Sequence, residues 1–275
     1  MPQNSIFHPD FKPMPYWWEA YHPTAQDPLD MPPRTQVAIV GGGYGGLSTA
    51  LELTKHGLDC VVLEAAELGF GASTRNGGAV SGGVNIGKSF SGKSVIIEPK
   101  RAENLLADAA DAFTLIERLI SEENIDCHWQ KTGRFSGAWT PAHYESQAKR
   151  VAMLNGPARS ECFMVPRERQ REEIASDYYY GGMVVERSAS LHPALYYKGL
   201  LDACRRRGIP ICARAAVTRI SGAGQSWTVQ TVRGTVQAEA VVIATNGYTG
   251  DITPALKRRV VPIASHIIAT EELPE

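Results

Sequence analysis

The chain has 275 residues, of which 43% are hydrophobic and 21% charged, and its net charge at pH 7 is −1. These values are typical of a soluble globular protein of one or two domains, and they give no electrostatic case for a nucleic-acid partner or a membrane surface. The cysteine usage and the lack of a signal-peptide pattern at the N-terminus predict a cytoplasmic location. No apolar run is long enough to span a membrane, and the five cysteines, odd in number and without C-x-x-C spacing, predict neither a disulfide framework nor a metal site.

The first segment, residues 1–35, contains eight of the chain's 17 prolines and the aromatic run Tyr16-Trp17-Trp18. Proline at this density excludes regular helix or sheet. We therefore predict an irregular N-terminal arm that is held in place by its aromatic side chains.

An apolar run at 37–40 is followed at once by Gly41-Gly42-Gly43-Tyr44-Gly45-Gly46. The spacing G-x-G-x-x-G between a strand and a helix predicts a dinucleotide-binding turn. Gly41 permits the tight turn, Gly43 lets a pyrophosphate approach the backbone, and Gly46 lets the helix pack closely. Apolar residues at helical spacing, with a glycine at 57, predict that this helix ends near residue 56.

A second buried strand is predicted at 60–63, and it ends at Glu64, 18 residues after Gly46. The dinucleotide fingerprint places a carboxylate near this distance, where it binds the ribose hydroxyls. The alternative is a solvated residue at the end of a strand. The βαβ unit by itself does not distinguish FAD from NAD.

The loop at 69–78, Gly-Phe-Gly-Ala-Ser-Thr-Arg-Asn-Gly-Gly, opens a second glycine-rich stretch that extends to residue 87. Its amides, hydroxyls and single arginine suit a long cofactor with a diphosphate and a ribityl chain. This loop favours FAD over NAD, whereas the alternative is an ordinary surface loop.

The remaining elements alternate between helical and strand patterns. A long amphipathic helix is predicted at 98–120, a mixed region at 125–185 with a helical piece at 147–154, and a helix from Leu191-His192-Pro193 to Gly208. Strands are then predicted at 210–213, 217–220, 227–232, 236–238 and 240–244, followed by a polar turn at 245–248.

Taken together, these motifs resemble the D-amino-acid-oxidase-like superfamily of FAD-dependent oxidoreductases, and within it the gamma-glutamylputrescine oxidase-like branch. The resemblance rests on Tyr16-Trp17, the G-A-S-x-R-N-G-G loop at 71–78, L-H-P at 191–193, A-T-N-x-Y-T at 244–249 and V-x-P-I-x-S-x-I-I-A-T-E at 260–271.

The resemblance implies an α/β fold with a Rossmann-like FAD-binding domain of the glutathione-reductase type and a partial mixed-sheet substrate domain. The implied division is an arm at 1–35, an FAD-binding domain at 36–120 and 186–253, and a substrate domain at 121–185 and 254–275. Because the family is longer than this chain, the sequence resembles an N-terminal fragment that ends just after a strand begins at 267–270.

Our candidates for catalytic residues near the flavin are Arg75 and Asn76, with His266 as a weaker third whose alternative is a strand histidine paired with a neighbour. The resemblance also assigns cofactor-binding roles to individual residues. The predicted cofactor-binding residues are Gly41, Gly43, Gly46, Glu64, Ser73, Thr74, Arg75, Asn76, Gly77, Gly78, Val217, Thr245, Asn246 and Gly247. Because no histidine lies between His56 and His128, covalent flavin attachment through a histidine of this loop is not expected.

The implied activity is oxidation of the C–N bond of an amine or amino acid, such as a gamma-glutamylputrescine-like secondary amine, by hydride transfer to FAD. Oxygen or another acceptor would then take the electrons. Two alternatives stay open at this point, a non-catalytic FAD-binding fragment or subunit and an NAD-dependent dehydrogenase. The sequence leaves open the substrate, the choice between oxidase and dehydrogenase, and the oligomeric state.

Overall fold

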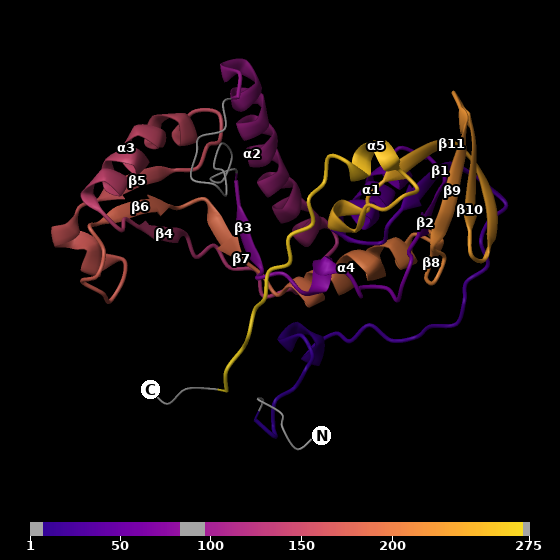
Figure 1. Ribbon diagram of the computed structural model, residues 1–275, viewed down its shortest axis with the longest axis horizontal. Helices are drawn as coiled ribbons and strands as arrows, with labels where there is room; N and C mark the ends of the chain where they lie inside the picture. Colours follow the sequence, from indigo (N-terminus) through magenta and orange to yellow (C-terminus); the bar gives the residue numbers. More distant parts are fainter. Residues whose placement is uncertain (1–7, 83–96, 272–275) are drawn as a thin grey trace. The chain divides into compact units, whose positions relative to one another are not determined.

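The computed structural model describes residues 8–82 and 97–271, and the chain divides into two compact units (Figure 1). The first unit combines the two ends of the chain, Met1–Gly77 and Pro193–Glu275, and the second is the continuous segment Gly78–His192. The first unit is therefore interrupted in sequence by the whole of the second.

A six-stranded sheet forms the centre of the first unit. In spatial order its strands are β8 (Ile211–Cys212), β2 (Cys60–Leu63), β1 (Arg34–Val40), β11 (Gly234–Ile243), β10 (Ser226–Thr231) and β9 (Val217–Ala223). The first four strands are mutually parallel, whereas β9, β10 and β11 form an antiparallel meander. The predicted strands at 236–238 and 240–244 are a single strand, β11, which pairs with β1 on one side and β10 on the other.

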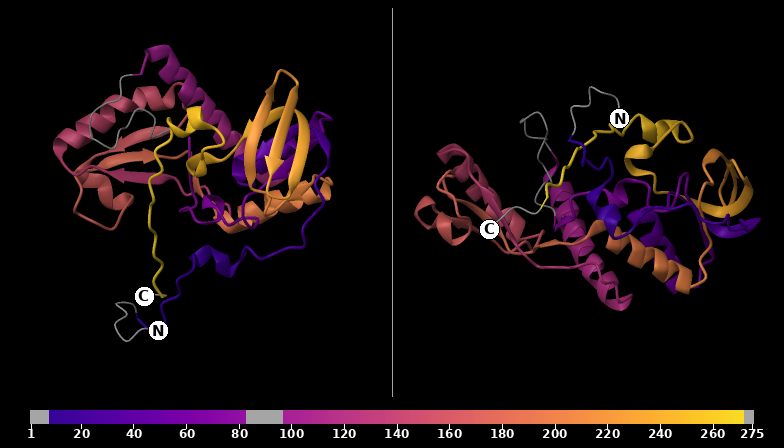
Figure 2. Two further views of the ribbon diagram at one scale, coloured as in Figure 1. Left: turned by 45° about the vertical axis from the view of Figure 1, so that its right-hand side comes forward. Right: turned by 90° about the horizontal axis from the view of Figure 1, so that it is seen from below.

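The two faces of this sheet are covered differently. Helix α1 (Tyr44–Lys55) contacts β1 and β2, and α4 (Pro193–Arg206) packs against α1; both helices can be followed in Figures 1 and 2. On the opposite face, Ala38 and Val61 belong to an apolar cluster against which Met31 of the arm packs. Burial on both faces explains why the parallel strands read as continuous apolar runs.

Over residues 8–33 the N-terminal arm is irregular apart from one 3₁₀ turn, Tyr16–Glu19, as its proline content predicts. It is tied to the first unit at several points along its length. Arg205 donates a hydrogen bond to the Gln26 side chain, and the Arg233 guanidinium donates one to the carbonyl oxygen of Leu29 at 2.6 Å. The arm therefore lies against the unit as an ordered segment.

The described residues of the second unit, 78–82 and 97–192, form two α-helices and two small antiparallel sheets. These elements are α2 (Pro99–Glu122), α3 (Pro141–Asn155), the sheet β4 (Arg134–Gly137), β6 (Gly182–Val185) and β5 (Cys162–Val165) in that spatial order, and the pair β3 (Ala79–Ser81) and β7 (Ser188–Ser190). Leu106 of α2 and Leu154 of α3 pack on Cys162, Met183 and Val185 of the sheet, and so form the core of this unit.

The division by contacts differs from the expected domain boundaries. Helix α2, expected in the FAD-binding domain at 36–120, belongs to the second unit because Leu106 packs into the core there. Residues 254–271, expected in the substrate domain, belong by their contacts to the first unit and contain one short helix, α5 (Pro254–Lys257). The functional assignment of the two units stays a prediction.

The strand expected at 267–270 does not form. The chain from 260 to 271 is irregular and exposed, and Ile268 is 82% exposed. No strand within the described ranges lies beside this segment to pair with its backbone, and an extended segment without a partner leaves its N–H and C=O groups to water. The prediction of a strand from the pattern of apolar residues at 267–270 was therefore wrong.

No helix in the described parts of the chain combines the length and apolar character needed to cross a membrane.

All five cysteines are buried and unbridged. Burial raises the pKa of the Cys127 thiol to about 11, and it also raises the thiol pKa of Cys60, Cys162 and Cys212. At pH 8 a thiol with a pKa of about 11 is thiolate in roughly one molecule in a thousand.

We therefore expect the native chain to react with less than about one equivalent of a disulfide reagent such as dithionitrobenzoate within minutes at pH 8. The same chain in denaturant should react with five equivalents, one for each cysteine. Rapid reaction of two or more thiols in the native state would contradict the burial described here.

Candidate functional site

The candidate site is formed where β1, β2 and β11 end side by side in the first unit. The amide of Gly41 donates a hydrogen bond to the carbonyl oxygen of Leu63 at 2.9 Å, and the amide of Ala244 donates one to that of Val40 at 2.8 Å. Because the three strands are parallel, the turns that follow them meet at one edge of the sheet. In α/β folds this edge is where ligands bind.

The turn after β1 depends on two glycines with no room for a side chain. Gly41 has a φ of +109°, and a Cβ at this position would lie 2.7 Å from the carbonyl oxygen of Ala244. A Cβ on Gly46 would lie 1.9 Å from the carbonyl oxygen of Gly41. The helix α1 can therefore approach the turn this closely only because residue 46 has no side chain.

The N-terminus of α1 faces the second glycine-rich loop. Helix α1 begins at Tyr44, whose amide donates a hydrogen bond to Ser73 Oγ at 3.1 Å, and a Cβ on Gly43 would lie 2.9 Å from the same oxygen. The first intrahelical bond is donated by Leu47, so the amides of Gly45 and Gly46 precede the ladder. These amides and the helix dipole favour an anionic group.

Glu64 lies directly after β2 and is half-buried. Its Oε2 accepts a hydrogen bond from the amide of Gly42 at 2.7 Å, and its Oε1 accepts one from the amide of Ala66 at 3.0 Å. Each carboxylate oxygen has a second lone pair, which leaves acceptor capacity for a ligand hydroxyl. Glu64 therefore connects the glycine turn to the end of the second strand.

The loop at 69–76 is held by its own side chains. Thr74 is fully buried, and its hydroxyl donates a hydrogen bond to the carbonyl oxygen of Gly69 at 2.6 Å. The Asn76 amide nitrogen donates to the carbonyl oxygens of Ala72 and Ser73, both at 3.2 Å. These bonds fix the loop in a tight turn next to α1.

Arg75 lies among aromatic rings. Its guanidinium carbon is 4.3 Å from the centre of the Phe70 ring and 5.1 Å from that of Trp18, and its Nη2 donates to the carbonyl oxygen of Phe70. Its Nε is buried and makes no hydrogen bond within the described residues. The guanidinium is thus held in place while one donor is left for a further acceptor.

The other predicted cofactor residues lie at the start of β9 and in the turn that follows β11. Val217 begins β9, two residues after Ala215, whose amide donates to the carbonyl oxygen of Glu64 at 2.8 Å. Thr245 lies two residues after the end of β11, and its hydroxyl lies 2.7 Å from that of Thr249. Asn246 has a φ of +46° and, with Gly247, forms a short 3₁₀ turn.

Two predicted positions lie outside this arrangement. Gly78 has a φ of +72° and belongs to the second unit, where its carbonyl oxygen accepts a hydrogen bond from Leu191. His266 is exposed on the irregular segment, without a hydrogen bond or ion pair in the described parts of the chain. The next residue, Ile267, has its Cδ1 3.8 Å from where a Cβ on Gly77 would lie.

Sequence reasoning missed two aromatic residues at this site. The indole nitrogen of Trp18 donates a hydrogen bond to Thr74 Oγ1 at 2.8 Å. The Tyr44 hydroxyl donates to the carbonyl oxygen of Pro193 at 2.8 Å and accepts from the Asn76 amide at 3.4 Å. The clustering of tryptophans in the arm was a signal for the first, whereas nothing in the sequence distinguished Tyr44.

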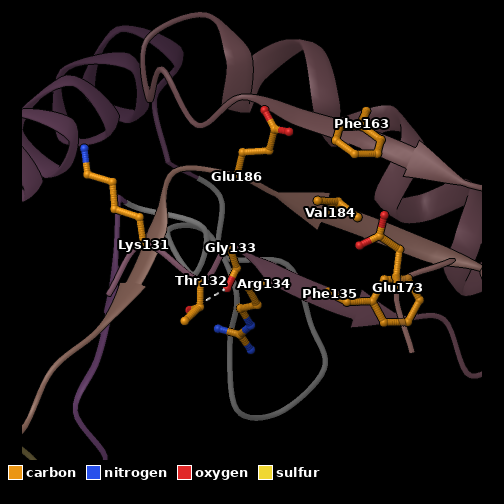
Figure 3. Close-up of a pocket in the computed structure, with 9 residues that line it drawn as sticks. All are labelled: Lys131, Thr132, Gly133, Arg134, Phe135, Phe163, Glu173, Val184 and Glu186. Carbon is orange, nitrogen blue, oxygen red and sulfur yellow. Dashed lines mark hydrogen bonds between the residues drawn. The ribbon is translucent and has the colours of Figure 1, made fainter. Parts of the chain in front are cut away.

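The second unit contains an open pocket of about 380 Å³ on the sheet face opposite the helices (Figure 3). Phe135, Val184 and Phe163 lie directly across from one another on β4, β6 and β5 and form its floor. Glu173 and Glu186 lie at its margin, and Lys131 is paired with Glu117 at 2.6 Å. None of these residues was predicted as a site residue.

The chain matches the model of the family described as DAO, FAD dependent oxidoreductase, over residues 36–275. It is 34% identical over 244 residues to gamma-glutamylputrescine oxidoreductase of Escherichia coli strain K12, covering 87% of this chain and 55% of that protein. The chain thus spans a little over half the length of this relative.

Solved structures show the same fold. Glycine oxidase from Geobacillus kaustophilus has a TM-score of 0.67 at 22% identity, over 82% of this chain and 59% of that one. L-proline dehydrogenase from P. horikoshii has a TM-score of 0.68 at 17% identity, and the match covers 82% of this chain and 56% of that one.

The two glycine turns also fit the long cofactor of this family. Together they provide the amides of Gly45 and Gly46 at a helix N-terminus, the Ser73 hydroxyl and the unpaired Nε of Arg75, whereas the buried Thr74 hydroxyl is used within the loop. FAD is accordingly the cofactor that the family assigns to this site. The chain therefore belongs to the DAO family of FAD-dependent oxidoreductases.

Proposed function

We propose that this chain binds FAD and belongs to an enzyme that oxidises the C–N bond of a small amine or amino acid. The observation that carries the proposal is the convergence of the Gly41–Gly46 turn, Glu64 and the 69–76 loop at one edge of the sheet. A nicotinamide enzyme has no need of the second loop. The family match supports the same reading.

Within this proposal each group has a defined task. The amides of Gly45 and Gly46, with Ser73 Oγ, would bind the diphosphate, and Glu64 would accept hydrogen bonds from the adenosine ribose. Arg75 and Asn76 would lie toward the flavin and orient it. When bound, FAD supplies the acceptor for the hydride removed from the carbon next to the substrate nitrogen.

The first unit would hold the cofactor, and the second would contribute to substrate binding. A gamma-glutamylputrescine-like secondary amine is our proposed substrate, because the name of the E. coli relative indicates that compound and the identity is 34%. Oxygen or another acceptor would reoxidise the flavin. The open pocket of the second unit has an aromatic floor, and its two carboxylates, Glu173 and Glu186, are balanced by Lys131 and Arg134, so its charges do not select a substrate.

The test is the visible spectrum of the purified chain, reconstituted with FAD and titrated anaerobically with a panel of amines and amino acids. We expect flavin absorption near 450 nm that bleaches with one class of amine. A flavin spectrum that no amine bleaches would favour the alternative, a non-catalytic FAD-binding fragment. Fluorescence titration with NADH serves as the control for a nicotinamide enzyme, and we expect no binding.

A further inference from the structure

The N-terminal arm contacts the second glycine-rich loop through one part-buried hydrogen bond. The indole N–H of Trp18 donates to Thr74 Oγ1 at 2.8 Å, and the same hydroxyl donates to the carbonyl oxygen of Gly69 at 2.6 Å. The Thr74 hydroxyl thus connects the arm to the start of the loop. Because Thr74 is fully buried, water cannot replace either bond.

Aromatic rings of the arm enclose the rest of this turn. Gly69 has a φ of +89°, and a Cβ there would lie 2.9 Å from ring carbons of both Tyr21 and Tyr197. The Tyr21 hydroxyl donates to the carbonyl oxygen of Leu68 at 3.0 Å. The Trp18 ring lies 5.1 Å from the guanidinium carbon of Arg75. The arm therefore contacts the loop at 69, 74 and 75 and the residue before it, Leu68.

The arm is itself anchored away from the loop. Met31 packs on the core cluster of the sheet, and the carbonyl oxygen of Leu29 accepts a hydrogen bond from Arg233. The Gln26 side chain accepts one from Arg205 of α4. Trp18 is therefore presented to Thr74 from a fixed support.

Ser73 and Thr74 are adjacent, so whatever fixes Thr74 also fixes the Ser73 hydroxyl at the N-terminus of α1. We propose that Trp18 is a positioning residue, which acts through Thr74 to hold the 69–76 loop in the conformation that binds the FAD diphosphate. This inference rests on the proposed function, since it assumes that the loop binds FAD. A loop held in place before the ligand arrives binds more tightly, because less ordering is required on binding.

The test uses Trp18→Phe, which keeps an aromatic ring near Arg75 and removes the indole N–H. We expect the Kd for FAD, measured by quenching of flavin fluorescence on titration into the apo-protein, to rise about five- to tenfold, as for the loss of one hydrogen bond. The matched control is Trp227→Phe, which removes an indole hydrogen bond to the carbonyl oxygen of Gly224 in the β9–β10 hairpin. The control should leave the Kd unchanged.

A double-mutant cycle with Thr74→Val tests the route of the effect. If Trp18 acts through the hydroxyl, Trp18→Phe should change the Kd less than twofold when Thr74 is already valine. Equal effects in the two backgrounds would overturn the proposed route. An unchanged Kd in Trp18→Phe, with or without a lower Tm, would overturn the positioning role.

Hydrogen–deuterium exchange of the apo-protein separates this inference from the proposed function. We expect amides of the 69–76 loop to exchange at least threefold faster in Trp18→Phe and at the wild-type rate in Trp227→Phe. If the wild-type chain fails to bind FAD while the loop still loosens, the proposed function fails and the positioning of the loop stands. Unchanged exchange in the loop would refute the positioning role.

Discussion

The Gly46→Ala variant is expected to lose about 3 kcal/mol of folding stability and to bind FAD at least 100-fold more weakly than the wild type. The new Cβ would lie 1.9 Å from the carbonyl oxygen of Gly41, so the helix and the turn must separate. This oxygen belongs to the backbone, so it cannot rotate away. The separation moves the amides of α1 away from the place where the diphosphate would bind.

The neighbouring Gly45→Ala variant is the matched control. No heavy atom lies within 4 Å of a Cβ at position 45, and the exchange improves helix propensity by about 0.5–1 kcal/mol. Urea unfolding of the two variants, one residue apart, separates the steric effect on stability from the loss of a glycine. FAD titration of Gly46→Ala is compared with the wild type, because Gly45 itself lies in the proposed diphosphate site. Equal stability of the two would show that the turn after β1 is not packed as described.

Glu64→Ala should raise the Kd for FAD about 100-fold, because two ribose hydroxyls would lose a charged acceptor. The apo-protein should also lose about 2 kcal/mol, since the amides of Gly42 and Ala66 lose their partner. Glu64→Gln keeps one carbonyl oxygen as an acceptor. Its Kd for FAD and the stability of its apo-protein should therefore lie between those of the wild type and Glu64→Ala. Isothermal titration with FAD and urea unfolding report the two effects separately.

Glu239→Ala removes an exposed carboxylate from β11 and controls for the change in net charge. We expect its stability to change by less than about 0.5 kcal/mol and its FAD affinity to stay constant. If Glu64→Ala lowered the stability of the apo-protein but left its affinity for FAD unchanged, Glu64 would stabilise the fold and would not bind the cofactor.

The sequence was sufficient where a local pattern decides the structure. The glycine spacing after 37–40 located β1 and α1 correctly, and Pro193 with Gly208 bounded α4. The sequence was not sufficient to predict strands whose bounds depend on pairing with a neighbouring strand. Residues 234–243 form one strand because β10 pairs with its first half and β1 with its second, and the two ladders overlap at 237–238. Residues 267–270 form none because no strand lies beside them in the described ranges.

The same distinction applies to the site. Gly41, Gly46 and Glu64 are close in sequence, so the spacing of the βαβ unit brings them together. The bond between Trp18 and Thr74 joins positions 56 residues apart, and no periodicity reports such a contact. The membership of α2 in the second unit depends likewise on Leu106 meeting Leu154, which only the packing reveals.

The interrupted first unit has a consequence for synthesis of the protein on the ribosome. Strand β1 pairs with β2 nearby, but its other neighbour, β11, ends at Ile243, so the central strand keeps an open edge until about 200 further residues have been made. The continuous segment Gly78–His192 can collapse before then. We expect late closure of the sheet to limit the folding rate and to leave the nascent chain dependent on chaperones that shield the β1 edge.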